Sequence, residues 1–165
     1  MTIPAVLIPR RSPLRWLMAA AAVTAAAAHI PVIGPHLEEA PYMGVLFILL
    51  TIACLMLATA AILYDAPAVY LAAAITCGLT IVGYAATRLV AFPMLADDVG
   101  NWMEPLGVVS IIAEAIVVAC SIAVLWARRA ARAHRAVGID NDLARIGEID
   151  SLELGGHGAD VDHQR

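Results

Sequence analysis

The sequence places the ionisable side chains of Tyr84, Arg88 and Glu114 inside apolar stretches. A charge within lipid costs free energy unless it is paired, so such residues mark ion or proton pathways, polar ligand sites or structural ion pairs. Tyr84 lies nine residues before Pro93, and Glu114 lies nine residues after Pro105. In two antiparallel helices this is a depth of about 13 Å for each. Because Arg88 lies one turn from Tyr84 on the same helix face, we expect the three to form one intramembrane polar cluster.

Two interpretations of this cluster are open. The functional one is a relay for protons or ions, or an anchor for a polar ligand. The structural one is an ion pair between Arg88 and Glu114 that fixes how two helices pair, with the Glu114 carboxyl kept protonated by its apolar surroundings. We favour the structural interpretation, which predicts that the two side chains depend on each other.

A second group of candidate ligands lies near the ends of the apolar stretches. Imidazole and carboxylate groups bind copper, zinc or another divalent ion, but the spacing here matches no specific metal motif. A pair of acidic, solvated loops explains the same residues, so we predict no cofactor and keep a metal site on this rim as the alternative. The rim consists of His29, His36, Glu38, Glu39, Asp97, Asp98 and Glu104.

Haem would need axial ligands on facing helices, and only His29 is expected at membrane depth, which argues against haem. Aromatic side chains at the ends of apolar stretches are typical of anchors at the membrane interface. The expected anchors are Trp16, Tyr42, Trp102 and Trp126.

The elements that must position these residues are long apolar helices. The chain of 165 residues is 62% hydrophobic and 15% charged, whereas soluble domains are about half apolar. A membrane crossing needs about 20 apolar residues, and four stretches meet this length: 14–33, 42–64, 68–92 and 105–127. The sequence therefore predicts an all-α protein, an integral membrane four-helix transmembrane bundle. The linkers are expected at 34–41, 65–67 and 93–104, and Pro41 and Pro105 are expected to mark helix starts.

The distribution of charge predicts the topology. Arginines precede the first apolar stretch and follow the last, and the expected linkers at 34–41 and 93–104 are acidic. By the positive-inside rule both termini are cytoplasmic, and the protein is a multi-pass protein of the cell (plasma) membrane. We expect a cytoplasmic arm (1–13), the four-helix transmembrane domain (14–127), and a basic helix extension followed by an acidic, largely disordered tail (128–165). The basic residues flank spans without interleaved aromatics, which argues against nucleic acid as a partner.

Three short motifs resemble a group of small bacterial, actinobacterial-type, four-helix integral membrane proteins. The segments 36–47, 88–93 and 102–107, with Glu114, fit the pattern H…E…G-x-x-F, S-R-x-x-x-x-P and E-x-x-G…E, with Thr87 in place of serine. The resemblance implies a four-helix fold and suggests that these polar positions matter to the group. It implies no activity.

Three functions are consistent with these observations. The expected one is a non-catalytic accessory or interaction subunit of a membrane assembly, because the sequence contains no soluble domain or nucleotide motif. Its partners would be the lipid bilayer and either another membrane protein or further copies of itself. The alternatives are a metal- or redox-linked protein that uses the rim, and a small proton or ion transporter that uses Arg88 and Glu114.

Overall fold

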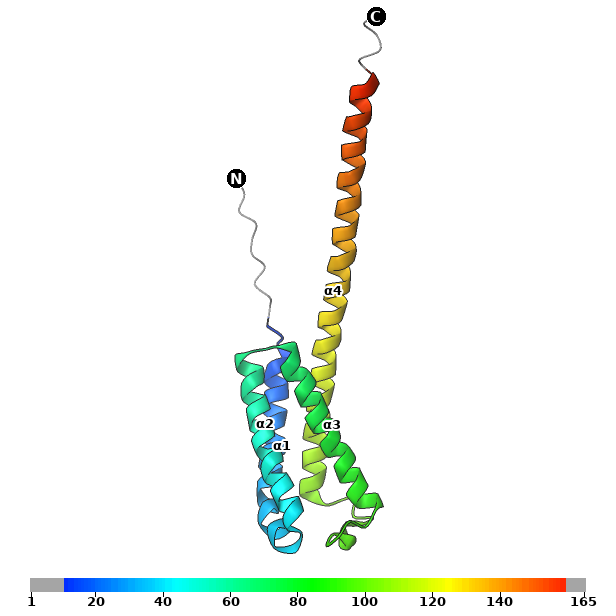
Figure 1. The fold of residues 1–165 in the computed structure, drawn as a ribbon. Coiled ribbons are helices and arrows are strands. Elements are labelled where there is room, and N and C mark those ends of the chain that lie inside the picture. The colour runs from blue at the N-terminus through cyan, green and yellow to red at the C-terminus, as the bar shows by residue number, and fades with distance from the viewer. Residues whose placement is uncertain (1–10, 160–165) are drawn as a thin grey trace, which may run out of the picture. The chain divides into compact units, whose positions relative to one another are not determined.

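The computed structural model describes residues 11–159, and it describes side chains for residues 11–135, Gly138 and Ile139. Its elements are α1 (Leu14–Glu39), α2 (Pro41–Leu63), α3 (Pro67–Leu89), a short 3-10 helix η1 (Ala96–Asp98) and α4 (Pro105–Ala159) (Figure 1). Four helical segments are long and apolar enough to cross a membrane, the fourth being Pro105–Arg135 of α4. The prediction of an all-α protein with four such helices is confirmed.

The chain divides into two compact units, residues 1–125 and 126–165. The first unit contains α1, α2, α3, η1 and the beginning of α4, and it carries all the sites discussed below. The second unit contains the rest of α4, a single helix. The expectations for residues 1–10 and 160–165 lie outside the described residues.

Proline occupies the first position of α2, α3 and α4. Proline suits this position because the first N–H groups of a helix have no partner within the helix. The expected helix starts at Pro41 and Pro105 are confirmed. Helix α2 ends in a tight turn at Asp65, whose φ is 44° and whose carboxylate accepts hydrogen bonds from Ser12 N (2.9 Å) and Tyr70 Oη (2.5 Å).

Helix α1 is longer than predicted. It was expected to end near residue 33, but it continues to Glu39 through Pro31 and Pro35. The linker between the first two helices is therefore a single residue, Ala40, which is fully buried. Gly44 explains how the helices meet so closely, because a Cβ there would lie 2.6 Å from Cγ of Leu37.

Helix α4 also differs from the prediction. The helical extension was expected to give way to a largely disordered tail, but the structure is helical through Ala159. No proline follows Pro105 in the sequence, so nothing removes a backbone N–H from this helix.

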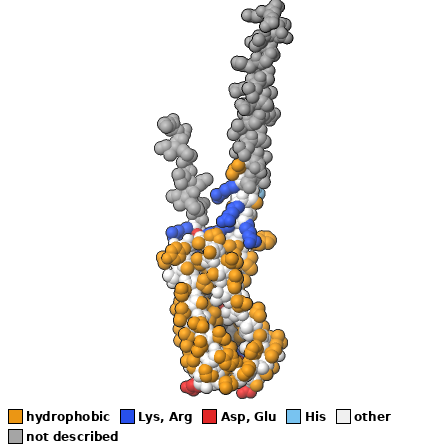
Figure 2. All heavy atoms as spheres, in the orientation of Figure 1, with side chains coloured by type: hydrophobic (Ala, Val, Ile, Leu, Met, Phe, Trp, Pro, Cys, Tyr) orange, Lys and Arg blue, Asp and Glu red, His pale blue; other side chains and the backbone are white. Residues whose placement is uncertain are grey.

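Most of the buried core residues of the first unit have small side chains. Alanine and cysteine are prominent in its core, with larger contributions from Met18, Tyr70 and Val117. Small residues let helix backbones approach closely, which is how membrane helices pack against one another. The visible flank of the bundle is covered with hydrophobic side chains (Figure 2), as lipid-facing helices would be.

Candidate ligand-binding cavity

The first unit contains a cavity of about 550 Å³ between its four helices. It lies toward the end of the bundle that carries Ala40 and the segment 90–104, which we call the loop end. Figure 2 shows the surface hollowed between α2 and α3 on this side. Three leucines of the lining, Leu46, Leu49 and Leu79, are each more than half exposed. The cavity is therefore open sideways, through the gap between α2 and α3.

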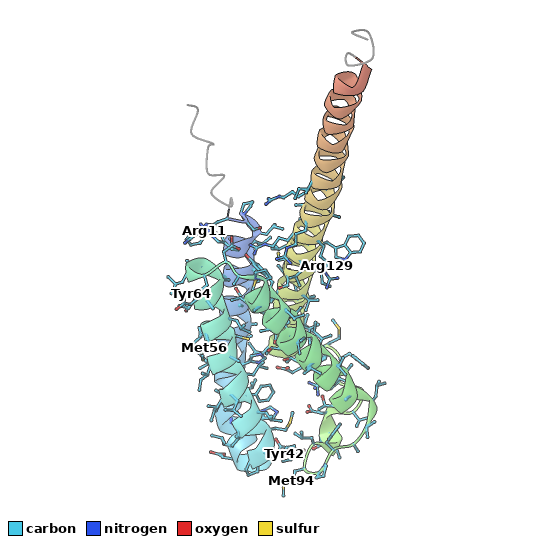
Figure 3. All side chains as sticks on the ribbon, turned by 45° about the horizontal axis from the view of Figure 1, so that its top comes forward. Arg11, Tyr42, Met56, Tyr64, Met94 and Arg129 are labelled. Atoms are coloured by element: carbon cyan, nitrogen blue, oxygen red, sulfur yellow. The ribbon has the colours of Figure 1, made fainter. Side chains whose placement is uncertain are left out.

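The α3–α4 connection closes the loop end. The segment 90–104 folds back on α3, with a hydrogen bond of 2.9 Å from Gly100 N to Arg88 O. Tyr42 of α2 donates a hydrogen bond of 2.7 Å from its hydroxyl to Pro93 O. Figure 3 shows Tyr42 and Met94 near each other at this end of the bundle. This arrangement holds the polar residues of the segment against the cavity.

At the inner part of the cavity, the lining residue His29 forms a buried imidazole–carboxylate pair with Glu114, which lies behind the lining. His29 of α1 is 3% exposed and Glu114 of α4 is fully buried. His29 Nε2 lies 3.2 Å from Glu114 Oε1 and 3.3 Å from Ser110 Oγ, one turn earlier on α4. The other carboxylate oxygen of Glu114 has no hydrogen-bond partner in the described part of the chain. Removing either member of such a buried pair leaves a polar group unpaired, which is costly in a membrane.

Arg88 has a different partner. Its guanidinium forms an ion pair with the Asp98 carboxylate, donates a 3.3 Å hydrogen bond to Asp98 O, and lies 4.6 Å from the centre of the Tyr84 ring. The expected ion pair between Arg88 and Glu114 is therefore not formed. The structure brings Tyr84 and Arg88 together, as predicted, but it places Glu114 with His29. Helix α1 continues past residue 33 to Glu39. His29 therefore lies well inside the bundle, and not in the last turn of the helix, as an end at residue 33 would have placed it.

Glu104 holds the beginning of α4. Its carboxylate accepts hydrogen bonds from Leu106 N (3.3 Å) and Gly107 N (2.7 Å). A carboxylate at this position also interacts favourably with the helix dipole. Tyr84 packs beside it and donates a hydrogen bond of 3.0 Å from its hydroxyl to Trp102 O.

The remaining rim residues do not gather into one ligand set. Glu38, Glu39 and Asp97 are exposed. His36 lines the cavity, with Nδ1 2.8 Å from Val32 O and its ring 4.9 Å from that of Phe47. Among the described residues, no three His, Cys, Asp or Glu side chains lie close enough to share a metal ion.

The expected interface anchors are all partly or largely exposed. Trp16, at the start of α1, is 56% exposed, and Tyr42 and Trp102, at the loop end, are 40% and 44% exposed. Trp126 belongs to the second unit and is 72% exposed. Exposed aromatic side chains at helix ends are suited to the membrane interface.

Sequence reasoning missed two members of the site. Ser110 was not among the expected site residues, although it lies one turn before Glu114 and so on the same face. Phe47 is the second: its ring lies 5.4 Å from that of His29, and it appeared in the sequence only as part of a motif.

The chemistry of the site is that of an amphipathic binding pocket. Leucine is the commonest residue of the lining, and other apolar side chains and glycines adjoin it. The polar groups come from threonines of α3, from the loop end, and from His29 and Ser110. Comparison with protein-family models, curated proteins and solved structures finds no match for this chain.

Proposed function

We propose that this protein is a non-catalytic, multi-pass membrane protein that binds an amphipathic small molecule in the cavity between its helices. The observation that carries the proposal is the cavity itself, which is open through the α2–α3 gap and is lined by leucines and other apolar side chains together with polar groups of α3, of the loop end and of His29. Its volume of about 550 Å³ falls in the usual range for small-molecule sites, roughly 300–1,000 Å³.

The surroundings of the cavity indicate where the ligand comes from. Its opening is flanked by exposed leucines of α2 and α3, two helices with the length and hydropathy of membrane spans. In a bilayer such an opening faces lipid tails, so the ligand would enter from the membrane. We place the protein in the plasma membrane with both termini cytoplasmic, in keeping with the distribution of arginine and acidic residues.

This function agrees with the role of an accessory subunit, since binding requires no reaction centre. It is better supported than ion transport through Arg88 and Glu114, because the two belong to separate pairs. It is also better supported than metal binding on the rim, because the described rim residues are dispersed.

A space-filling variant tests the proposal. Gly83 lines the cavity, and a Cβ there would meet nothing within 4 Å; Gly78 of the same helix has equal room but does not line the cavity. We expect Gly83→Phe to fill the opening and Gly78→Phe to leave it free. The probe is a long-chain alcohol that carries a photoreactive diazirine, added to the full-length protein in lipid nanodiscs. Labelling of cavity residues should persist in wild type and Gly78→Phe and be lost in Gly83→Phe, whereas equal labelling of both variants would contradict the proposal.

A further inference from the structure

The imidazole ring of His29 is the polar group best placed to recognise a molecule in the cavity. Both polar contacts of the ring, to Glu114 and Ser110, are made by Nε2. Nδ1 makes no hydrogen bond to any residue in the described part of the chain. Because His29 lines the cavity, Nδ1 is the ring atom left for a bound molecule.

The pairing with Glu114 determines whether Nδ1 carries a proton. A buried pair is far more stable when its net charge is zero, since an uncompensated charge in a low-dielectric interior is costly. Three arrangements have zero net charge. In one of them a carboxylic acid accepts from Nε2–H through its carbonyl oxygen, and its own O–H is then on the buried Oε2, which has no hydrogen-bond partner in the described part of the chain. Two arrangements avoid this unpaired donor. In one, a carboxylate faces an imidazolium, which has protons on both nitrogens. In the other, a carboxylic acid donates to Nε2 of a neutral ring, whose own proton is then on Nδ1. Nδ1–H is a hydrogen-bond donor in both.

We propose that the cavity binds an apolar molecule with a carbonyl oxygen, and that His29 Nδ1–H donates a hydrogen bond to this oxygen. The inference rests on the proposed function and names the chemical class of its ligand. Phe47 and His36 support it, because their rings border the same region and provide apolar and aromatic contacts for the group that carries the oxygen. Two kinds of membrane molecule have this chemistry: a ring carbonyl with an apolar tail, and an ester carbonyl of an acyl lipid.

Matched probes test the inference on the full-length protein in nanodiscs. The carbonyl probes are decyl-benzoquinone and dioctanoylglycerol, and decylbenzene is the probe without an oxygen. We expect wild type to bind at least one carbonyl probe about 2- to 10-fold more tightly than decylbenzene, the contribution of one hydrogen bond. The infrared carbonyl stretch of that probe should move to lower frequency on binding, and the probe that shows the effect identifies the source of the carbonyl.

The test variant removes both members of the pair, His29→Phe with Glu114→Leu, so that neither ionisable group is left buried without the other. Ser110 loses its contact with Nε2, but a serine hydroxyl in a helix can donate to a carbonyl one turn earlier. The variant should still bind decylbenzene but lose the preference and the frequency shift. Equal binding of all probes to wild type and variant would overturn the hydrogen bond and leave the proposed function intact. Failure of wild type to bind any of the three probes would overturn the proposed function itself. If the double variant does not fold, the frequency shift in wild type and its absence in Gly83→Phe decide the question.

Discussion

At the scale of single residues, Arg88 and Glu114, which are both buried in the bundle, interact with separate partners. Arg88 is 6% exposed and pairs with Asp98 of η1, while Glu114 of α4 pairs with His29 of α1. Each pair joins segments that are far apart in sequence or separated by a loop. Each pair therefore stabilises a specific tertiary contact, because separating the two segments would leave a buried polar group without its partner.

The pairing of Arg88 can be measured by double-mutant cycles. Arg88→Leu and Asp98→Ala should each lower thermal stability in detergent, and the double variant should recover part of the loss, with a coupling of about 0.5–3 kcal/mol. Arg88→Leu combined with Glu114→Leu should instead be additive within about 0.5 kcal/mol, because the two share no partner. Asp97→Ala, an exposed neighbour of Asp98, is the control and should have little effect. Coupling between Arg88 and Glu114 as large as that with Asp98 would contradict the structure.

Glu114 is expected to respond to the kind of side chain that replaces it. Glu114→Leu removes the carboxyl partner of His29 Nε2 and leaves only the 3.3 Å contact with Ser110 Oγ. It should destabilise the protein by about 1–3 kcal/mol, the cost of a buried polar group that loses a partner. Glu114→Gln should be milder, because an amide retains both a donor and an acceptor for the imidazole. Thermal unfolding in detergent measures both. Equal losses for Leu and Gln would mean that the hydrogen bond to His29 contributes nothing.

The sequence was sufficient to select these polar positions but not to pair them. Their selection follows from the cost of charge within an apolar stretch, which needs no structure. Their pairing depends on where each helix begins and on its rotation. The expected end of the first helix near residue 33 placed His29 in a last turn, so the histidine was assigned to the rim instead of to Glu114.

At the scale of elements, close approach between helices depends on particular glycines. A Cβ on Gly107 of α4 would lie 2.6 Å from Cε2 of Tyr84 and 2.6 Å from Oε2 of Glu104. The glycine therefore gives the Tyr84 ring its position over the start of α4. The existence of the helices was easier to predict than their lengths. Helix α1 continues through Pro31 and Pro35 beyond its expected end, and α4 has no proline after Pro105 that would end it.

Gly107→Ala should displace the Tyr84 ring and weaken the contact between α3 and α4. We expect a loss of stability of about 1–3 kcal/mol, as for other overpacked sites. Gly83→Ala is the matched control: a Cβ there meets nothing within 4 Å, and alanine favours the helix by up to about 1 kcal/mol. Both are compared by thermal unfolding in detergent. If the two substitutions have the same effect, the close contact at Gly107 is not important for stability.

At the scale of the whole molecule, the four helices were predictable because hydropathy and length determine which segments can cross a bilayer. The cavity was not. It depends on how far α3 separates from α2 at the loop end, and single-sequence patterns do not contain the relative tilt of two helices. The polar residues that surround the cavity were visible in the sequence, but the space between them was not.

The membrane topology of the four helices can be tested by cysteine accessibility. With Cys54, Cys77 and Cys120 replaced, a cysteine at exposed Asp97 should react with an impermeant maleimide added outside intact cells. A cysteine at exposed Ala133 should react only after the cells are permeabilised. The distribution of arginine gives the physical reason, since positively charged segments are retained in the cytoplasm. Reaction of both positions from the same side would contradict the arrangement of four spans.

The sideways opening between α2 and α3 changes what a dissociation constant means for this protein. A molecule that enters from the bilayer is dissolved in lipid, and its apolar part already resides there, so burial in the cavity gains little from leaving water. Occupancy would then follow the number of ligand molecules per lipid and not their concentration in the aqueous phase. Diluting a membrane suspension with buffer should leave the complex in place, whereas fusing the same membranes with ligand-free vesicles should empty it.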